Sequence, residues 1–276
     1  MYADKRRMAA VSPAKKDRPQ SVLKAIKAAP AKPQNAEMSA ADAIKHLLML
    51  GNATVAQHVR GFFKTGPGEY GEGDQFLGIR QPVLRHFVRD FRDAGIEVAL
   101  PLLKSCWHEA RSLSLMLLVK AYHRAALRGD EKTQKRIYDF YLKHTRFINN
   151  WDLVDLSAEH IVGAWLHSRD RSPLIKLAKS RSIWERRIAI LATFHYIKKG
   201  EYAETLRIAK FLLKDDEDLI QKAVGWMLRE VGKRVGEEVE ETFLKRHYRA
   251  MPRTMLRYAI ERFAETKRRQ YLRGEI

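Results

Sequence analysis

Helical periodicity is the feature that most constrains the fold of this chain. From residue 40 onward, apolar residues recur at the three- and four-residue spacing of amphipathic helices, and no convincing run of alternating residues predicts a sheet. Turn signals at Arg128-Gly129-Asp130, Lys199-Gly200, Gly236 and Pro252 separate the segments. Helices are expected over residues 41–50, 52–63, 80–93, 108–127, 131–142, 153–167, 173–179, 182–198, 202–213, 217–234, 237–247 and 253–269. The sequence therefore predicts an all-α protein.

The helices recur at a spacing typical of helical repeats. Trp151, Trp184 and Trp226 lie 33 and 42 residues apart, each within or just before an amphipathic helix. Helix pairs of this period stack so that neighbouring pairs share one continuous core. Residues 37–276 are accordingly predicted to form a right-handed α-solenoid of HEAT-like or armadillo-like repeats, with a concave basic groove.

The charge of the chain points to a polyanionic partner. Its 52 lysine and arginine residues exceed 33 aspartate and glutamate residues, which gives a net charge of +19 and favours nucleic acid. Residues 1–36 carry +7 of this charge, four prolines and no aromatic residue except Tyr2. So little apolar surface predicts a disordered basic arm, or a leader with no role. The remaining +12 lies on the predicted repeat domain.

Several classes of protein are excluded. No stretch approaches the ~20 consecutive apolar residues that a membrane span needs, and the amino terminus lacks the apolar region of a secretory signal. The single cysteine excludes an internal disulfide framework and a cysteine-rich zinc site. The ten histidines form no metal-ligand cluster. We expect a cytoplasmic monomer, associated with the nucleoid in a bacterium, that needs no metal or cofactor.

A glycine-rich segment interrupts the helical pattern. Residues 64–78, KTGPGEYGEGDQFLG, hold five of the fifteen glycines. Such a segment is either a functional loop or a plain connector between helices. It lacks the GK[ST] ending of a phosphate-binding loop and follows no strand, which disfavours a nucleotide site.

Two residues break the amphipathic pattern of their helices. Trp226 lies off the apolar stripe of the helix at 217–234, beside the cationic Lys222 and Arg229, and so suits a sugar or base. The alternative is packing against the next repeat. Arg187 lies inside the apolar stripe of the helix at 182–198, where a guanidinium is costly unless paired. It needs a carboxylate or a phosphate, and a structural ion pair with an adjacent repeat is the competing interpretation.

A third group combines an indole with a carboxylate. Trp151 and Asp155 are four residues apart, which places them on the same face of a helix one turn apart. Asp152 suits the N-cap of this helix, and Asp155 would then be an acidic residue near its positive end. Both interpretations leave Asp155 ionised, as a site that stabilises a cation requires.

Taken together, these segments resemble the AlkD family of DNA alkylation repair glycosylases, which are built from HEAT-like repeats. The similarity covers about residues 40–265. It runs through Phe76-Leu77-Gly78-Ile79-Arg80-Gln81-Pro82-Val83-Leu84-Arg85, Trp107-His108-Glu109-Ala110-Arg111, Trp151-Asp152-Leu153-Val154-Asp155, Ile183-Trp184-Glu185-Arg186-Arg187-Ile188-Ala189-Ile190-Leu191, Ile220-Gln221-Lys222-Ala223-Val224-Gly225-Trp226-Met227-Leu228-Arg229-Glu230 and Arg257-Tyr258-Ala259-Ile260. This chain departs from the family at Asn150, where a second aromatic residue is common, and in the glycine-rich segment.

The resemblance implies a catalytic site and a reaction. The catalytic carboxylate of the family matches Asp155, its two tryptophans match Trp151 and Trp226, and its arginine matches Arg187. The implied reaction is base excision repair by a monofunctional hydrolase, which removes cationic N3- or N7-alkylated purines from duplex DNA without a deep pocket for a flipped base. Arg187 would then hold a phosphate.

The same resemblance implies DNA contacts and leaves an alternative open. The expected phosphate contacts are Lys222, Arg229, Arg80, Arg85 and Arg257. The alternative function is a non-catalytic HEAT-repeat protein that binds branched or damaged DNA. The presence of Asp155 argues against that alternative.

Overall fold

The computed structural model describes residues 39–91 and 96–276. The basic arm predicted over residues 1–36 lies outside these ranges. Within them every regular element is a helix, and the one β-type contact is an isolated bridge between Gln75 and Trp107. The all-α prediction is confirmed.

The structure has long helices joined by short turns. The α-helices are α2 (Ala40–Leu50), α3 (Ala53–Arg60), α4 (Gln81–Asp90), α5 (Ile96–Leu103), α6 (His108–Leu127), α7 (Glu131–Lys143), α8 (Trp151–Asp155), α9 (Ala164–Leu166), α10 (Ser172–Ala178), α11 (Ile183–Ala192), α12 (Phe194–Ile197), α13 (Ala203–Phe211), α14 (Asp218–Arg234), α15 (Glu237–His247), α16 (Arg253–Ala259) and α17 (Glu265–Arg273). Single turns of 3₁₀ helix occur at η1 (Thr145–Phe147), η3 (Tyr248–Ala250) and η4 (Ile260–Arg262), and a π-helical turn at η2 (Glu159–Gly163).

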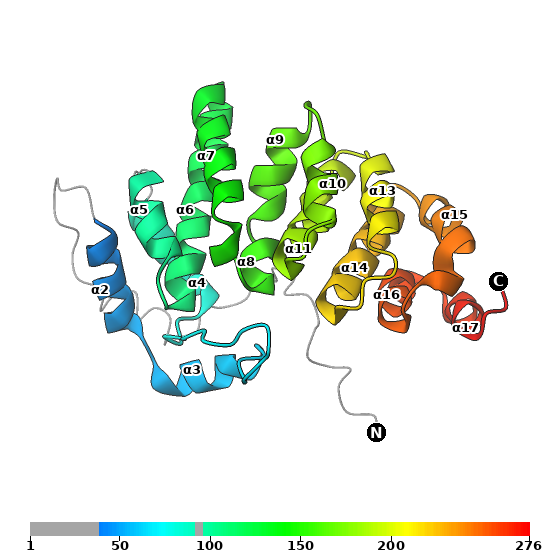
Figure 1. Cartoon of the computed structure of the whole chain (residues 1–276), viewed down its shortest axis with the longest axis horizontal. Coiled ribbons are helices and arrows are strands. Elements are labelled where there is room, and N and C mark those ends of the chain that lie inside the picture. The colour runs from blue at the N-terminus through cyan, green and yellow to red at the C-terminus, as the bar shows by residue number, and fades with distance from the viewer. Residues whose placement is uncertain (1–38, 92–95) are drawn as a thin grey trace.

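The helices form a one-dimensional stack. They follow one another in chain order along the long axis, from α2 at one end to α17 at the other (Figure 1). Consecutive helices pack in pairs, such as α5 with α6 and α10 with α11, and the later helices α8, α11, α14 and α16 pack side by side. This arrangement is an α-solenoid.

Two hydrophobic clusters fill the stack, and α6 separates them. Leu113 and Leu117 pack with α2 and α4 in the smaller cluster. Leu115 and Leu118, on the other side of α6, belong to the larger cluster, which extends to α17. Burial on both sides explains why α6 shows almost no polar face. None of the helices within the described ranges is long and apolar enough to span a membrane.

Glycines set the distance between successive repeats at two places. A Cβ atom on Gly163, in η2, would lie 2.1 Å from the carbonyl oxygen of Ala192, and one on Gly225, in α14, would lie 2.4 Å from that of Met255. Real Cβ atoms do not approach other atoms this closely. The helices therefore meet at a separation that only glycine permits.

Three predicted helices are divided in the structure, and one helix is added. The predicted helix 153–167 is interrupted after Asp155, where the Ser157 hydroxyl donates to the Leu153 carbonyl, and 182–198 is interrupted at Thr193, whose hydroxyl donates to the Ile190 carbonyl. The predicted helix 253–269 is divided between α16 and α17, and α5 was not predicted because Pro101 lies inside it.

The glycine at position 78 anchors α3. Gly78 has φ +78°, and a Cβ on it would lie 2.2 Å from the Asn52 carbonyl oxygen. Gly78→Ala should lower the free energy of unfolding by about 3 kcal/mol or more, because it adds a backbone clash to a strained conformation. Gly73→Ala is the matched control: it has φ +82° but open space around it, so it should cost about 1–2 kcal/mol. Equal losses in urea titrations would contradict the close contact at Gly78.

Candidate active site

A buried ion pair between two repeats forms the centre of the site. The Arg187 guanidinium, on α11, donates two hydrogen bonds to the Asp155 carboxylate at the end of α8, over 2.9 and 2.8 Å. Its Nη1 donates to the Leu219 carbonyl of α14 over 2.6 Å. One side chain thus connects three successive repeats.

The sequence predicted that Arg187 needs a carboxylate or a phosphate as its partner, and in the structure the partner is a carboxylate. The residue is only 5% exposed, as its place inside the apolar stripe predicts. A carboxylate supplies the required countercharge, and the third contact is a backbone carbonyl. All three guanidinium nitrogens thus donate to Asp155 or to Leu219.

The Asp155 carboxylate is accessible in spite of the pair. Its side chain is 20% exposed, compared with 6% for that of Arg187. Burial raises the pKa of Asp155 above its ordinary value, the Arg187 charge and hydrogen bonds oppose the rise, and the negative charge of Asp152 adds to it. A carboxylate with a raised pKa that still faces solvent is suited to accept a proton or to stabilise a nearby cation.

Trp151 begins the short helix that ends at Asp155. The N-cap is Asn150, whose side-chain oxygen accepts a hydrogen bond from the Trp151 backbone N–H over 2.8 Å, so the predicted cap at Asp152 is wrong. Trp151 lies one turn before Asp155. One face of its indole stacks on Phe63, with centroids 5.3 Å apart at 22°, which leaves at most the opposite face for a ligand.

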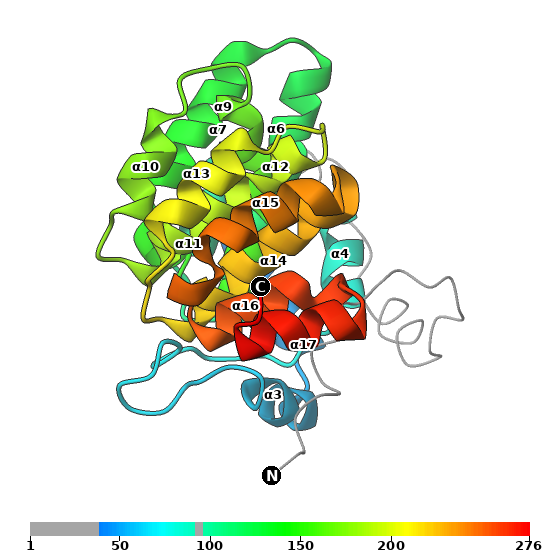
Figure 2. The same cartoon turned by 90° about the vertical axis from the view of Figure 1, so that its right-hand side faces the viewer.

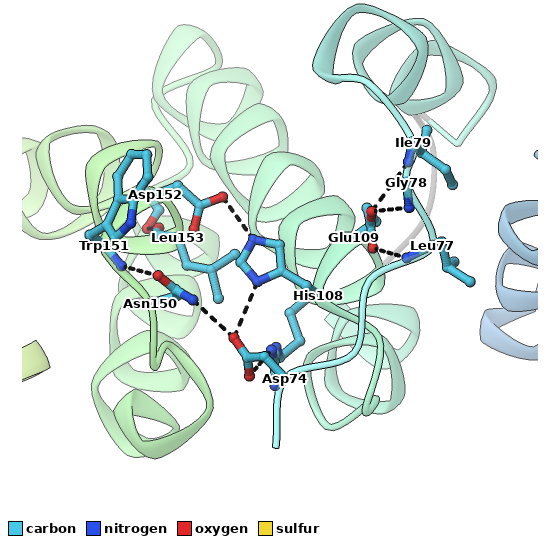
Figure 3. A network of polar contacts seen from close by, with 12 residues as sticks. Asp74, Leu77, Gly78, Ile79, His108, Glu109, Asn150, Trp151, Asp152 and Leu153 are labelled. Carbon is cyan, nitrogen blue, oxygen red and sulfur yellow. Dashed lines mark hydrogen bonds and ion pairs between the residues drawn. The ribbon is translucent and has the colours of Figure 1, made fainter. Parts of the chain in front are cut away.

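A buried polar network fixes the start of this helix (Figure 3). Asp74, from the glycine-rich segment, accepts hydrogen bonds from Asn150 at 2.9 Å and from Arg111 at 2.5 Å. The His108 imidazole lies between Asp74 and Asp152, 2.8 Å from the latter. Burial disfavours the charged imidazole, but the two carboxylates outweigh this effect and raise the pKa of His108 to about 9.

A third carboxylate in Figure 3, that of Glu109, holds the segment that leads into α4. Glu109 accepts hydrogen bonds from three consecutive backbone N–H groups, those of Leu77, Gly78 and Ile79, over 2.8 to 3.2 Å. Stacked rings also join this segment to α6, since Phe76 stacks on both Phe63 and His108. The glycine-rich segment is therefore joined to α6 and α8 by charges and by stacked rings.

Trp226 lies on α14, further from the ion pair. It is partly buried, and its ring contacts Phe194 of α12 with centroids 6.0 Å apart. Trp226 lies seven residues, or about two helical turns, after Leu219, whose carbonyl binds Arg187. Phe194 lies seven residues after Arg187 itself. The structure thus brings Trp151, Asp155 and Arg187 together. Trp226 lies about two turns further along α14 than the carbonyl that binds Arg187.

The predicted DNA contacts differ in their pairing. Lys222 bonds to Asp218 over 2.8 Å, and Arg229 forms an ion pair with Glu261. Within the described ranges no acidic partner is found for the exposed residues Arg80, Arg85 and Arg257. Of the five predicted contacts, these three therefore have no ion-pair partner within the described residues.

The fold and the site define a class of protein: an α-solenoid of basic charge in which an accessible aspartate, paired with a buried arginine, lies one turn from an indole. The chain belongs to the family of DNA alkylation repair enzymes, whose family model matches residues 43–263. This membership makes DNA the partner of the protein.

One solved structure supports the fold. A predicted DNA alkylation repair enzyme from Enterococcus faecalis is similar over 78% of this chain and 97% of its own, with a TM-score of 0.57 and 16% sequence identity. At that identity the similarity concerns the fold alone. No curated protein matches the sequence.

The raised pKa of His108 predicts a pH-dependent stability. A folded-state pKa near 9, above the ordinary value of 6.5, gives a stabilisation that is complete below about pH 6.5 and disappears as the pH rises through about 9. His108→Gln should therefore be destabilised relative to wild type at pH 6, and the difference should shrink at pH 9.5 by up to about 3 kcal/mol. Urea titrations at both pH values measure it.

The exposed His58 on α3 supplies the control. His58→Gln should change the free energy of unfolding little at either pH. A His108→Gln difference that does not vary with pH would mean that the imidazole is neutral in the folded protein.

Proposed function

We propose that the protein is a monofunctional DNA glycosylase that hydrolyses the N-glycosidic bond of cationic N3- or N7-alkylated purines in duplex DNA. The observation that carries this proposal is the geometry at Asp155, a solvent-accessible carboxylate held by a two-bond arginine pair one turn from Trp151. Membership of a DNA alkylation repair family indicates that the substrate is DNA.

The chemistry suits a site that offers no deep pocket. A purine alkylated at N3 or N7 is already positively charged, so the glycosidic electron pair leaves with the base and no acid is needed. The deoxyribose remains as an oxocarbenium-like cation. Asp155 stabilises that cation electrostatically and accepts the proton of the water that attacks C1′, which completes hydrolysis.

The aromatic residues support the developing charge. The Trp151 face turned away from Phe63 and the ring of Trp226 approach the sugar and favour its cationic character through their ring faces. Because one face of Trp151 is covered by Phe63, the indole is fixed before substrate arrives, and little free energy is lost in orienting it.

Arg187 acts here as a positioning residue. The sequence suggested a phosphate contact, but its three hydrogen bonds to Asp155 and Leu219 support a different role. The guanidinium fixes the orientation of both carboxylate oxygens and keeps the group ionised. Phosphates are bound instead by Arg80, Arg85 and Arg257, with Lys222 and Arg229 nearer the site.

Replacing the carboxylate tests the proposal directly. Asp155→Asn should slow release of 7-methylguanine from methylated duplex DNA by about 100-fold or more, because it removes the charge that stabilises the cation, while binding to duplex DNA is retained. Single-turnover reactions analysed by chromatography of released bases measure the rate. The exposed Asp139, on α7, gives the control Asp139→Asn, which should match wild type.

Two outcomes would count against this assignment. Unchanged release by Asp155→Asn would remove the residue from the mechanism. Tight binding of branched or damaged DNA by a wild-type protein that releases no base would identify the non-catalytic alternative.

The ion pair itself predicts a change in pH dependence. Arg187 lowers the pKa of Asp155 against the effect of burial. A lysine cannot make the two-bond pair, so Arg187→Lys should move the acid limb of the rate profile to higher pH and slow the reaction about 10–100-fold at neutral pH.

The neighbouring Arg186 gives a matched control for Arg187→Lys. Arg186, on the same helix as Arg187, donates two hydrogen bonds to the Asp215 carboxylate over 2.7 and 3.3 Å. Arg186→Lys should keep the wild-type rate profile. A similar loss in both variants would show that only folding was affected.

A further inference from the structure

The glycine-rich segment places a tyrosine among the helices of the site. The Tyr70 ring meets that of Trp184, on α11, edge to face with centroids 5.7 Å apart. Burial raises the pKa of its hydroxyl, which the Lys64 backbone and the Trp151 indole lower and to which the charges of Asp218 and Lys222, on α14, also contribute. Tyr70 therefore touches or faces α8, α11 and α14 together.

These neighbours lie next to the residues of the central ion pair. Trp151 precedes Asp155 by four residues, and Trp184 precedes Arg187 by three. On α14, Asp218 directly precedes Leu219, whose carbonyl binds Arg187. The residue that Tyr70 contacts on α11, Trp184, thus lies about one helical turn before Arg187, near the amino-terminal end of that helix. Figures 1 and 2 show the segment running beneath the helix array, next to α3.

Internal hydrogen bonds fix the shape of the segment. The Gly71 N–H donates to the Lys64 carbonyl over 2.7 Å, and a Cβ on Gly71 would lie 2.6 Å from that oxygen. The carboxylates of Glu69 and Glu72 accept from backbone N–H groups within the segment, those of Gly66 and Gly68. The ring of Tyr70, between these contacts, is held in place before any ligand binds.

The far end of the segment is anchored as firmly. Asp74 is buried and bonded to Arg111 and to Asn150, the N-cap of the helix that carries Asp155. Phe63, just before the segment, stacks on Trp151. We call Phe63, Tyr70 and Trp184 the aromatic wall, since their ring contacts lie at the amino-terminal ends of α8 and α11.

We propose that the aromatic wall, through Tyr70, restricts excision to purines with small N-alkyl groups. This inference rests on the proposed function. A base attached to a sugar beside Asp155 lies within about a turn of the wall, so a large substituent directed toward it meets a ring that is fixed by Trp184 and by the closed segment. Accommodating that substituent requires displacement of Tyr70 and loss of its contacts, which slows release of bulky adducts.

The size limit is tested by comparing two lesions in the same duplex. Wild type should release N7-methylguanine much faster than N7-benzylguanine in single-turnover reactions. Tyr70→Ala opens the wall and should raise the benzyl-to-methyl rate ratio by about tenfold or more, the discrimination that an apolar contact provides. Tyr70→Phe keeps the ring and should keep the wild-type ratio.

A control and two opposing outcomes complete the experiment. Tyr202→Ala removes an exposed tyrosine before α13 and should leave both rates unchanged. If wild type releases methylguanine but the ratio is the same in Tyr70→Ala, or if wild type already releases both bases equally, the aromatic wall does not select size and the glycosylase assignment survives. If wild type releases neither base, the proposed function fails and this inference fails with it.

Discussion

The pairing of Arg187 is the constraint on which the site depends. A guanidinium that is 5% exposed must have a countercharge, since leaving it unpaired would cost several kcal/mol. Asp155 supplies that charge from the preceding repeat, and the Leu219 carbonyl of the following repeat completes the contact. The energetic demand of one buried cation therefore places a carboxylate at the junction of three repeats. The Asp155 side chain is the more exposed member of the pair, at 20% against 6% for Arg187.

Much of this could be anticipated from residue types and spacing. Helical periodicity predicts most of the helices, and the place of Arg187 in an apolar stripe predicts a buried ion. Periodicity could not show that Asp155 is the partner, because the two residues are 32 positions apart. It also missed Phe63, Tyr70, Asp74 and His108, which meet the site only through contacts between distant segments. Asp74 and Asn150 are 76 positions apart. The available signal was indirect: acidic residues and an aromatic ring within a segment otherwise rich in glycine.

The two departures from the family pattern are connected in the folded protein. The resemblance to the AlkD family singled out Asn150 and the glycine-rich segment as the two places where this sequence departs from the expected pattern. The Asn150 side chain both caps α8 and donates to Asp74, the anchor of that segment. A phenylalanine at this position could make neither hydrogen bond. Asn150 and the glycine-rich segment therefore form one structural unit, in which Phe63 contacts Trp151 and Tyr70 contacts Trp184.

The glycines at 163 and 225 have a consequence for the shape of the whole superhelix. Each removes a side chain at a contact between neighbouring repeats, and the helices close onto a backbone carbonyl. In a solenoid, a small change in the spacing at one contact is repeated as a rotation along the array. A single added methyl at either position would splay the coil and alter its curvature. The curvature of the superhelix is thus governed in part by two absent side chains, each at a contact between neighbouring helices.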